Sequence, residues 1–172
     1  MGYTGGSTKD PTYQNLGDHT ESLQIDFDDT VVSYQELLDL FFDYHDPYSQ
    51  SYSAQYKSAI FYENENQKLL AEKKKAALEE DMGKTVYTEI LPLETFYLAE
   101  AYHQKYHLRN VPLLANELKK KYPTLDAFLD APSVTRINGY VYGCGTLQNL
   151  LDDLPSFGLT TEAEELLKQL VE

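Results

Sequence analysis

SAIFYENENQKLLAEKKKAALEEDMGKTVYTEIL, residues 58–91, contains the clearest secondary-structure signals of the chain. Its first five residues form a short apolar run, which predicts a strand. Residues 65–82 predict a helix, and Gly83 ends it because glycine readily adopts the left-handed conformation found at helix ends. Residues 85–91 then alternate between apolar and polar side chains, which predicts a second strand. A helix between two strands indicates helices packed against a sheet.

Similar signals occur on both sides of this stretch. Residues 1–20 are rich in Gly, Thr, Asn, Asp and Pro, which predicts a loop. In residues 21–28 every second residue from Leu23 to Phe27 is apolar, so we expect a half-buried strand. Ser33 and Glu36 have the spacing of a capping box and predict the start of a helix that ends near Pro47. Further helices are expected over residues 97–108, 111–132, 147–154 and 161–170.

The composition limits the class of protein. A chain of 172 residues suits one domain. The net charge of −14 argues against a nucleic-acid partner, because phosphate backbones require clustered Lys and Arg. No apolar run is long enough for a membrane span, and the first residues do not resemble a secretory signal. The single cysteine, Cys144, excludes an intrachain disulfide and favours a reducing, cytoplasmic setting.

Clusters of polar residues raise the question of a metal site. Asp18, His19 and Glu21 are close in sequence, but their spacing matches no known zinc pattern. His103 and His107 have helical i, i+4 spacing, yet Gln104 stands where a metalloprotease carries Glu. We therefore expect no metal.

Glu21 lies where a loop is expected to enter a strand. In a partly apolar cleft, burial would keep such a carboxyl protonated, so that it could donate a proton. Taken alone, the position fits an ordinary strand-start residue facing water better. The 15 tyrosines suit the wall of a polar pocket, although most single tyrosines merely cover surface or core edge.

In combination, the polar motifs are specific. They occur in the order Gly-Tyr-Thr-Gly-Gly (2–6), Pro-Thr-Tyr (11–13), Gly-Asp-His-Thr-Glu (17–21), His-Asp-Pro (45–47), Gln-Tyr-Lys-Ser-Ala-Ile (55–60) and Ala-Glu-x-Tyr-His-Gln-Lys-Tyr (99–106). This series resembles the class A peptide methionine sulfoxide reductases. The resemblance implies an α+β fold, a two-layer ferredoxin-like sandwich with C-terminal helices added. We expect one domain over residues 1–172, with a family core over 1–110 and a helical extension over 111–172.

The resemblance also implies an activity. Family members reduce the S epimer of methionine sulfoxide, free or in oxidised proteins, and use thioredoxin or another thiol rather than a bound cofactor. By motif, Glu21 matches the general acid, while Tyr13 and Tyr56 match the two tyrosines that bind the sulfoxide oxygen. A protonated acid is needed because the sulfoxide oxygen leaves poorly until it is protonated.

The chain departs from the family pattern in three places. The family nucleophile lies in a Gly-Cys-Phe-Trp motif about twenty residues before Gly-Tyr-Thr-Gly-Gly, a segment that these 172 residues do not contain. We therefore expect the first strand and helix of the fold to be absent, and the chain to be inactive by itself. Ser51 stands where many members carry Asp. Cys144 lies in the region of the family's resolving cysteines, but it fits a small buried residue slightly better than a resolving thiol. A non-catalytic sulfoxide-binding module and a truncated isoform remain as alternatives.

Overall fold

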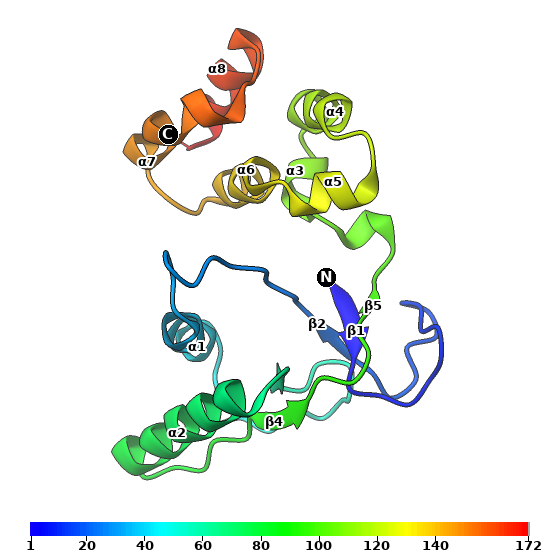
Figure 1. Cartoon of the computed structure of the whole chain (residues 1–172), viewed down its shortest axis with the longest axis vertical. Helices are drawn as coiled ribbons and strands as arrows, with labels where there is room; N and C mark the ends of the chain where they lie inside the picture. The colour runs from blue at the N-terminus through cyan, green and yellow to red at the C-terminus, as the bar shows by residue number, and fades with distance from the viewer. Residues whose placement is uncertain (172) are drawn as a thin grey trace. The chain divides into compact units, whose positions relative to one another are not determined.

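The computed structural model describes residues 1–171 and divides the chain into two compact units, Met1–Glu100 and Ala101–Glu172 (Figure 1). The first unit contains five short strands and two helices, whereas the second is helical. This mixture confirms the α+β class. The boundary falls ten residues before the one expected between family core and extension.

The first unit contains the strand–helix–strand segment that the sequence predicts. β3 (Ala59–Tyr62) and β4 (Glu89–Pro92) form a parallel pair, with Ile60 opposite Ile90, and α2 (Glu65–Met82) connects them. The helix ends at Gly83, whose φ of 60° is left-handed. β4 begins four residues later than expected, because the backbone N–H of Tyr87 donates to the Pro47 carbonyl instead of to β3.

α1 (Tyr34–Asp43) begins with the predicted capping box. The Ser33 hydroxyl accepts from the Glu36 N–H, and the Glu36 carboxylate accepts from the Ser33 N–H. This reciprocal pair satisfies two backbone donors that a helix start leaves without partners. The buried face of α1 contributes to a core that α2 and β3 complete, made of Leu38, Phe42, Ile60, Ala71 and Val86.

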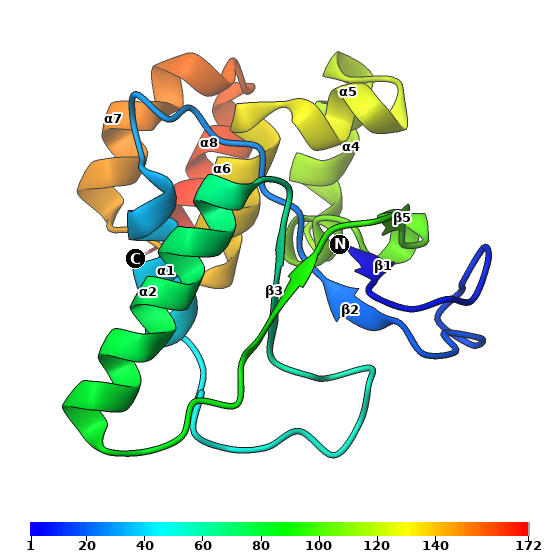
Figure 2. The same ribbon diagram turned by 60° about the horizontal axis from the view of Figure 1, so that its bottom comes forward.

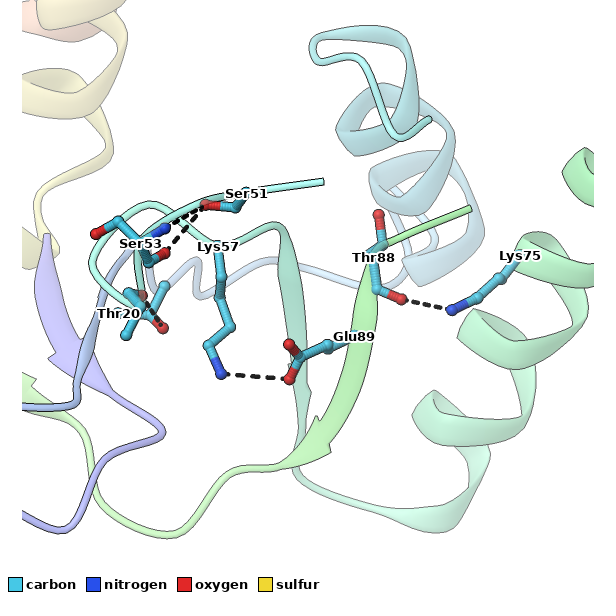
Figure 3. Close-up of polar contacts among 8 residues, drawn as sticks. Thr20, Ser51, Ser53, Lys57, Lys75, Thr88 and Glu89 are labelled. Atoms are coloured by element: carbon cyan, nitrogen blue, oxygen red, sulfur yellow. Dashed lines mark hydrogen bonds and ion pairs between the residues drawn. The ribbon is translucent and has the colours of Figure 1, made fainter. Parts of the chain in front are cut away.

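Two polar contacts hold β4 in this unit (Figure 3). Lys75 of α2 donates through its Nζ to the Thr88 carbonyl at 2.8 Å. Lys57, just before β3, forms an ion pair with Glu89 at 3.2 Å. The helix α2 and the loop before β3 thus both fix the start of β4.

A second sheet has the order β2-β1-β5 and is antiparallel throughout. It is formed by β2 (Thr20–Ser22), β1 (Gly2–Thr4) and β5 (Tyr97–Leu98). The predictions of a loop over residues 1–20 and a helix over 97–108 were therefore wrong in part. Tyr3 is only 1% exposed and pairs with Tyr97, so burial of the central strand outweighs the local turn signals.

Beyond β5 the expected helix is broken into two pieces. η1 (Ala101–His103) is a single 3-10 turn and α3 (Tyr106–Arg109) a single α-turn. Lys105 between them has a φ of +48°, a conformation that no continuing helix permits.

The strand expected over residues 21–28 ends at Ser22. Residues 23–28 continue without regular structure, and Leu23 and Ile25 are 68% and 52% exposed. The alternation of apolar residues is present, but within residues 1–171 no neighbouring strand pairs with this segment. A strand forms only where its backbone groups find partners, so this part of the prediction was wrong.

The second unit is a helical bundle. Its main helices are α4 (Pro112–Lys121), α5 (Leu125–Asp130), α6 (Pro132–Tyr142), α7 (Leu147–Phe157) and α8 (Thr161–Val171). The helices predicted over residues 111–132, 147–154 and 161–170 are confirmed, whereas α6, which contains Gly139, was not predicted. The fully buried Leu114, Leu118, Ile137, Leu150 and Leu167 form the centre of one apolar core. None of the described helices is long and apolar enough to cross a bilayer.

Candidate functional site

Glu21 and Tyr56 meet at one side chain, Gln55. The Gln55 amide nitrogen donates to Glu21 Oε1 at 2.7 Å and lies 3.1 Å from the Tyr56 hydroxyl. The backbone N–H of Glu21 also donates to the Gln55 carbonyl at 3.0 Å. The end of β2 and the loop before β3 are therefore joined at the point where the predicted acid and one predicted tyrosine lie.

Tyr13 belongs to the same cluster. Its hydroxyl raises the pKa of Tyr56 through its charge when ionised, and burial and the Glu21 carboxylate raise that pKa further. A hydrogen bond with Tyr13 also contributes to the shift, so the two hydroxyls lie within bonding reach. Both tyrosines remain largely accessible to solvent. The structure thus brings together all three residues that the motifs single out in this unit.

Glu100 positions Tyr13, a role that the sequence analysis did not assign. Its Oε1 accepts from the Tyr13 backbone N–H at 3.0 Å, and its Oε2 accepts from the Tyr3 hydroxyl at 2.7 Å. Tyr3 lies in the central strand, so the loop that carries Tyr13 is attached to the sheet through a carboxylate. Glu100 does lie in one of the quoted motifs, but no local pattern shows that its carboxylate contacts residues 87 and 97 positions away.

The neighbouring loop is held by Asp18 and His19. The Asp18 carboxylate accepts hydrogen bonds from the backbone and hydroxyl of Ser7 and from Thr8, and these bonds hold its pKa well below the usual range of an aspartate. His19 Nδ1 accepts from the Gly6 N–H, and its Nε2 donates to the Thr8 carbonyl. These contacts give the two side chains a structural role in the loop. Gly6 is required there, because a Cβ at this position would lie 2.6 Å from the backbone nitrogen of His19.

His45, which follows the C-terminal end of α1, supports the site. Its Nδ1 lies 2.6 Å from the Phe41 carbonyl and therefore donates to it. Its Nε2 consequently accepts from the Ser58 hydroxyl at 2.9 Å. The His-Asp-Pro and Gln-Tyr-Lys-Ser motifs are thus in contact, and this contact fixes the loop end that leads into β3.

A cavity of about 700 Å³ opens beside Glu21 and Tyr56. Its apolar wall includes Phe27, Leu37, Phe41, Phe61 and Phe96. Ser51 also lies on this wall, and its hydroxyl donates to the Ser53 carbonyl (Figure 3). The donors of the site therefore border an apolar space large enough for a small ligand.

Cys144 lies in the other unit, directly after the C-cap Gly143 of α6. Its backbone N–H donates to the Gly139 carbonyl, and its side chain is exposed. The preference for a small buried residue was therefore wrong, because the turn between two glycines directs the thiol outward. The same unit contains His103 and His107, which lie in separate short turns instead of on one helix.

Comparison with known proteins identifies the family. The model of the family described as "Peptide methionine sulfoxide reductase" matches residues 1–130. The chain belongs to this family. This is the family that the order of the motifs indicates. The matched region extends thirty residues into the helical unit.

Individual reductase relatives match different shares of the chain. A peptide methionine sulfoxide reductase from Drosophila melanogaster is 41% identical over 162 residues, which are 93% of this chain and 65% of the relative. A bacterial reductase from Pasteurella multocida is 42% identical over 118 residues, 63% of this chain and 68% of the relative. The chain thus spans about two thirds of the length of these relatives. The Drosophila match also includes most of the helical unit.

A solved structure supports the fold. The reduced form of Mxr1 from Saccharomyces cerevisiae superposes with a TM-score of 0.59 at 29% identity. The superposition covers 64% of this chain and 69% of Mxr1.

Proposed function

We propose that this chain carries the oxygen-binding and proton-donating half of a peptide-methionine (S)-S-oxide reductase site. The observation that carries the proposal is the meeting of Glu21 and Tyr56 at Gln55, with Tyr13 beside Tyr56, next to an apolar cavity. A methionine sulfoxide has one strongly accepting oxygen and an otherwise apolar side chain. The cluster of donors matches the oxygen, and the cavity wall matches the methyl and methylene groups.

The residues divide the chemistry between them. The two tyrosine hydroxyls donate to the sulfoxide oxygen and stabilise the charge that grows on it. Tyr56 keeps its hydroxyl protonated, and therefore able to donate, over the physiological range, because the ordinary pKa of tyrosine already lies well above it and Tyr13 raises the pKa of Tyr56 further. Glu21, in its protonated form, transfers a proton to that oxygen as the sulfur–oxygen bond breaks. Gln55 fixes the distance between the acid and Tyr56.

The redox step requires a thiolate. Its sulfur bonds to the sulfoxide sulfur, the protonated oxygen passes to the thiol as sulfenic acid, and methionine leaves. A second thiol then attacks the sulfenic sulfur, releases water and forms a disulfide, which thioredoxin or another dithiol reduces. No bound cofactor is needed. The substrates are oxidised proteins or free methionine sulfoxide, in the cytoplasm.

The 172 residues provide only one thiol for this step, Cys144, which belongs to the helical unit and not to the unit that contains the Glu21 cluster. We therefore propose that this polypeptide by itself binds the sulfoxide but reduces it very slowly. Binding without turnover would make it a sulfoxide-recognition module, and Cys144 would act at most as a resolving thiol.

The test separates binding from turnover. A fluorescent peptide with one methionine S-sulfoxide is titrated against the wild type and Tyr56→Phe, and the R epimer serves as ligand control. Loss of one hydrogen bond weakens binding by about three- to tenfold. Tyr44→Phe is the matched control, because Tyr44 is 83% exposed and lies outside the site. Equal affinity of all three proteins, or no preference for the S epimer, would reject the assignment.

Turnover is measured separately, with dithiothreitol as reductant. Product formation should stay close to the blank. Clear turnover that Cys144→Ser abolishes would instead make Cys144 the nucleophile and overturn the proposed division between binding and reduction.

A further inference from the structure

Gln55 lies in the loop of residues 44–58, which connects α1 to β3 without regular structure (Figure 2). Its backbone is nevertheless held against β2. The Gln55 carbonyl accepts from the Glu21 N–H at 3.0 Å. One residue earlier, the Ala54 carbonyl accepts from the Thr20 hydroxyl at 2.9 Å (Figure 3). The Gln55 side chain therefore starts from a fixed backbone, and its amide has a defined place beside the acid.

The Gln55 amide nitrogen acts as a donor to two different oxygens. Glu21 Oε1 lies 2.7 Å away, and an ionised carboxylate can only accept hydrogen bonds. An amide oxygen at this distance would repel the carboxylate, so the nitrogen is the end of the amide that faces Glu21. The nitrogen has a second hydrogen, and the Tyr56 hydroxyl oxygen lies 3.1 Å from it. One amide group thus donates to both the acid and the tyrosine.

These two hydrogen bonds determine where the hydrogens of the acid and the tyrosine lie. A protonated carboxyl carries its hydrogen on one oxygen only. Because Glu21 Oε1 accepts from the amide, the hydrogen of the protonated acid lies on Oε2. The Tyr56 oxygen also accepts from the amide, so its own hydrogen is directed away from Gln55. Both groups therefore keep their hydrogens on the sides that the amide does not occupy.

The pKa of Tyr56 agrees with this direction. Tyr13, burial and the Glu21 carboxylate raise the pKa of Tyr56, whereas the hydrogen bond with Gln55 lowers it. A hydrogen bond donated to the phenol oxygen stabilises the phenolate and so lowers the pKa. A bond accepted from the hydroxyl would stabilise the protonated form and raise the pKa instead. The lowering is therefore the effect expected of Gln55 as a donor.

We propose that Gln55 is a positioning residue of the site: its two amide hydrogens direct the acid proton of Glu21 to Oε2 and the Tyr56 hydrogen toward the substrate oxygen. Without the amide between them, the Tyr56 hydroxyl would donate to the Glu21 carboxylate, and the site would use up its own donor. With the amide in place, both groups remain able to donate to a sulfoxide. This inference rests on the proposed function for the identity of the substrate.

The direction of the hydrogen bond is tested without ligand. The ring carbon that bears the Tyr56 hydroxyl is followed by ¹³C NMR as a function of pH, in the wild type and in Gln55→Met. Methionine has a similar length but no donor, so its introduction should raise the pKa of Tyr56. Gln35→Met is the matched control, because Gln35 is exposed on α1 and does not line the cavity, and it should leave the titration curve unchanged. A curve for Gln55→Met that is unshifted, or shifted to lower pH, would overturn the proposal.

Gln55→Glu is a second variant of nearly the same shape. Its carboxylate accepts instead of donating, so it should draw the Tyr56 hydrogen to itself and withdraw it from the substrate. Affinity for the methionine S-sulfoxide peptide should fall about three- to tenfold in both Gln55→Glu and Gln55→Met. Affinity in Gln55→Glu equal to that of the wild type would show that an acceptor serves as well as a donor, and would overturn the proposal.

A double-mutant cycle separates positioning from a merely structural role. If Gln55 acts through the Tyr56 hydroxyl, Gln55→Met should weaken peptide binding less in the Tyr56→Phe background than in the wild type. Equal losses in both backgrounds would show that Gln55 acts only through the shape of the loop, against the proposal. Absence of peptide binding by the wild type would reject the proposed function and with it the substrate role of Gln55. The Tyr56 titration decides the direction of the hydrogen bond in either case.

Discussion

Replacement of Tyr3 by Phe removes one hydroxyl from the centre of the three-stranded sheet. That hydroxyl donates to Glu100 at 2.7 Å from a side chain that is 1% exposed. A hydrogen bond to a charged group contributes about 1.5–3 kcal/mol to stability. Glu100 keeps its bond to the Tyr13 N–H and is only partly buried, so we expect the lower end, about 1.5 kcal/mol. The midpoint temperature should fall by about 3–6 °C if the whole chain melts together, and more if the first unit melts alone.

The measurement is urea unfolding followed by circular dichroism, with the free energy of unfolding compared between variants. Tyr44→Phe is the control, since its hydroxyl is in solvent and its removal should change stability by less than about 0.5 kcal/mol. If Tyr3→Phe is as stable as this control, the bond to Glu100 contributes nothing net. The account of how the Tyr13 loop is attached to the sheet would then be refuted.

Three further changes test other parts of the structure. Gly83→Ala should lower the free energy of unfolding by about 1 kcal/mol, because φ at this position is +60°, and Gly83→Asn should lower it less. Thermal unfolding of both variants would show this order, and equal losses of stability would contradict it. Tyr140 donates to Asp153 at 2.8 Å, and burial together with this bond raises its pKa to about 12. The stability that Tyr140 adds is therefore present below about pH 10 and lost as pH rises toward 12, so wild type and Tyr140→Phe should converge in urea midpoint over that window. Asp18 has a lowered pKa because Ser7 and Thr8 donate to its carboxylate, so its contribution is present above about pH 4 and lost on further acidification. Asp18→Asn should be less stable than wild type at neutral pH, with a difference that shrinks below pH 4; a constant difference would reject this origin.

Local signals were sufficient where the interactions themselves are local. The capping box of Ser33 and Glu36 and the glycine end of α2 depend on atoms within four residues, and both are found as predicted. The three site residues of the first unit were found from the order of the motifs, and the structure brings Glu21, Tyr13 and Tyr56 together. Their catalytic roles stay predictions.

Local signals were insufficient where a distant partner decides. Residues 2–4 carry turn-forming glycines, yet they form the central strand because β2 and β5 supply partners on both sides. Leu23 and Ile25 carry a strand pattern, yet they remain exposed because no partner strand is adjacent in the described chain.

From the sequence alone, the resemblance of its motif series to a known family predicted the family, the α+β class and the residues of the donor cluster. The motifs can be recognised without folding, because they are residue types in a fixed order along the chain. Only the tertiary structure determined that Gln55 and Glu100 hold that cluster together, and that the strands of residues 1–171 form two separate sheets. Hydrogen bonds between segments many residues apart depend on how the whole unit packs, and no local pattern encodes them.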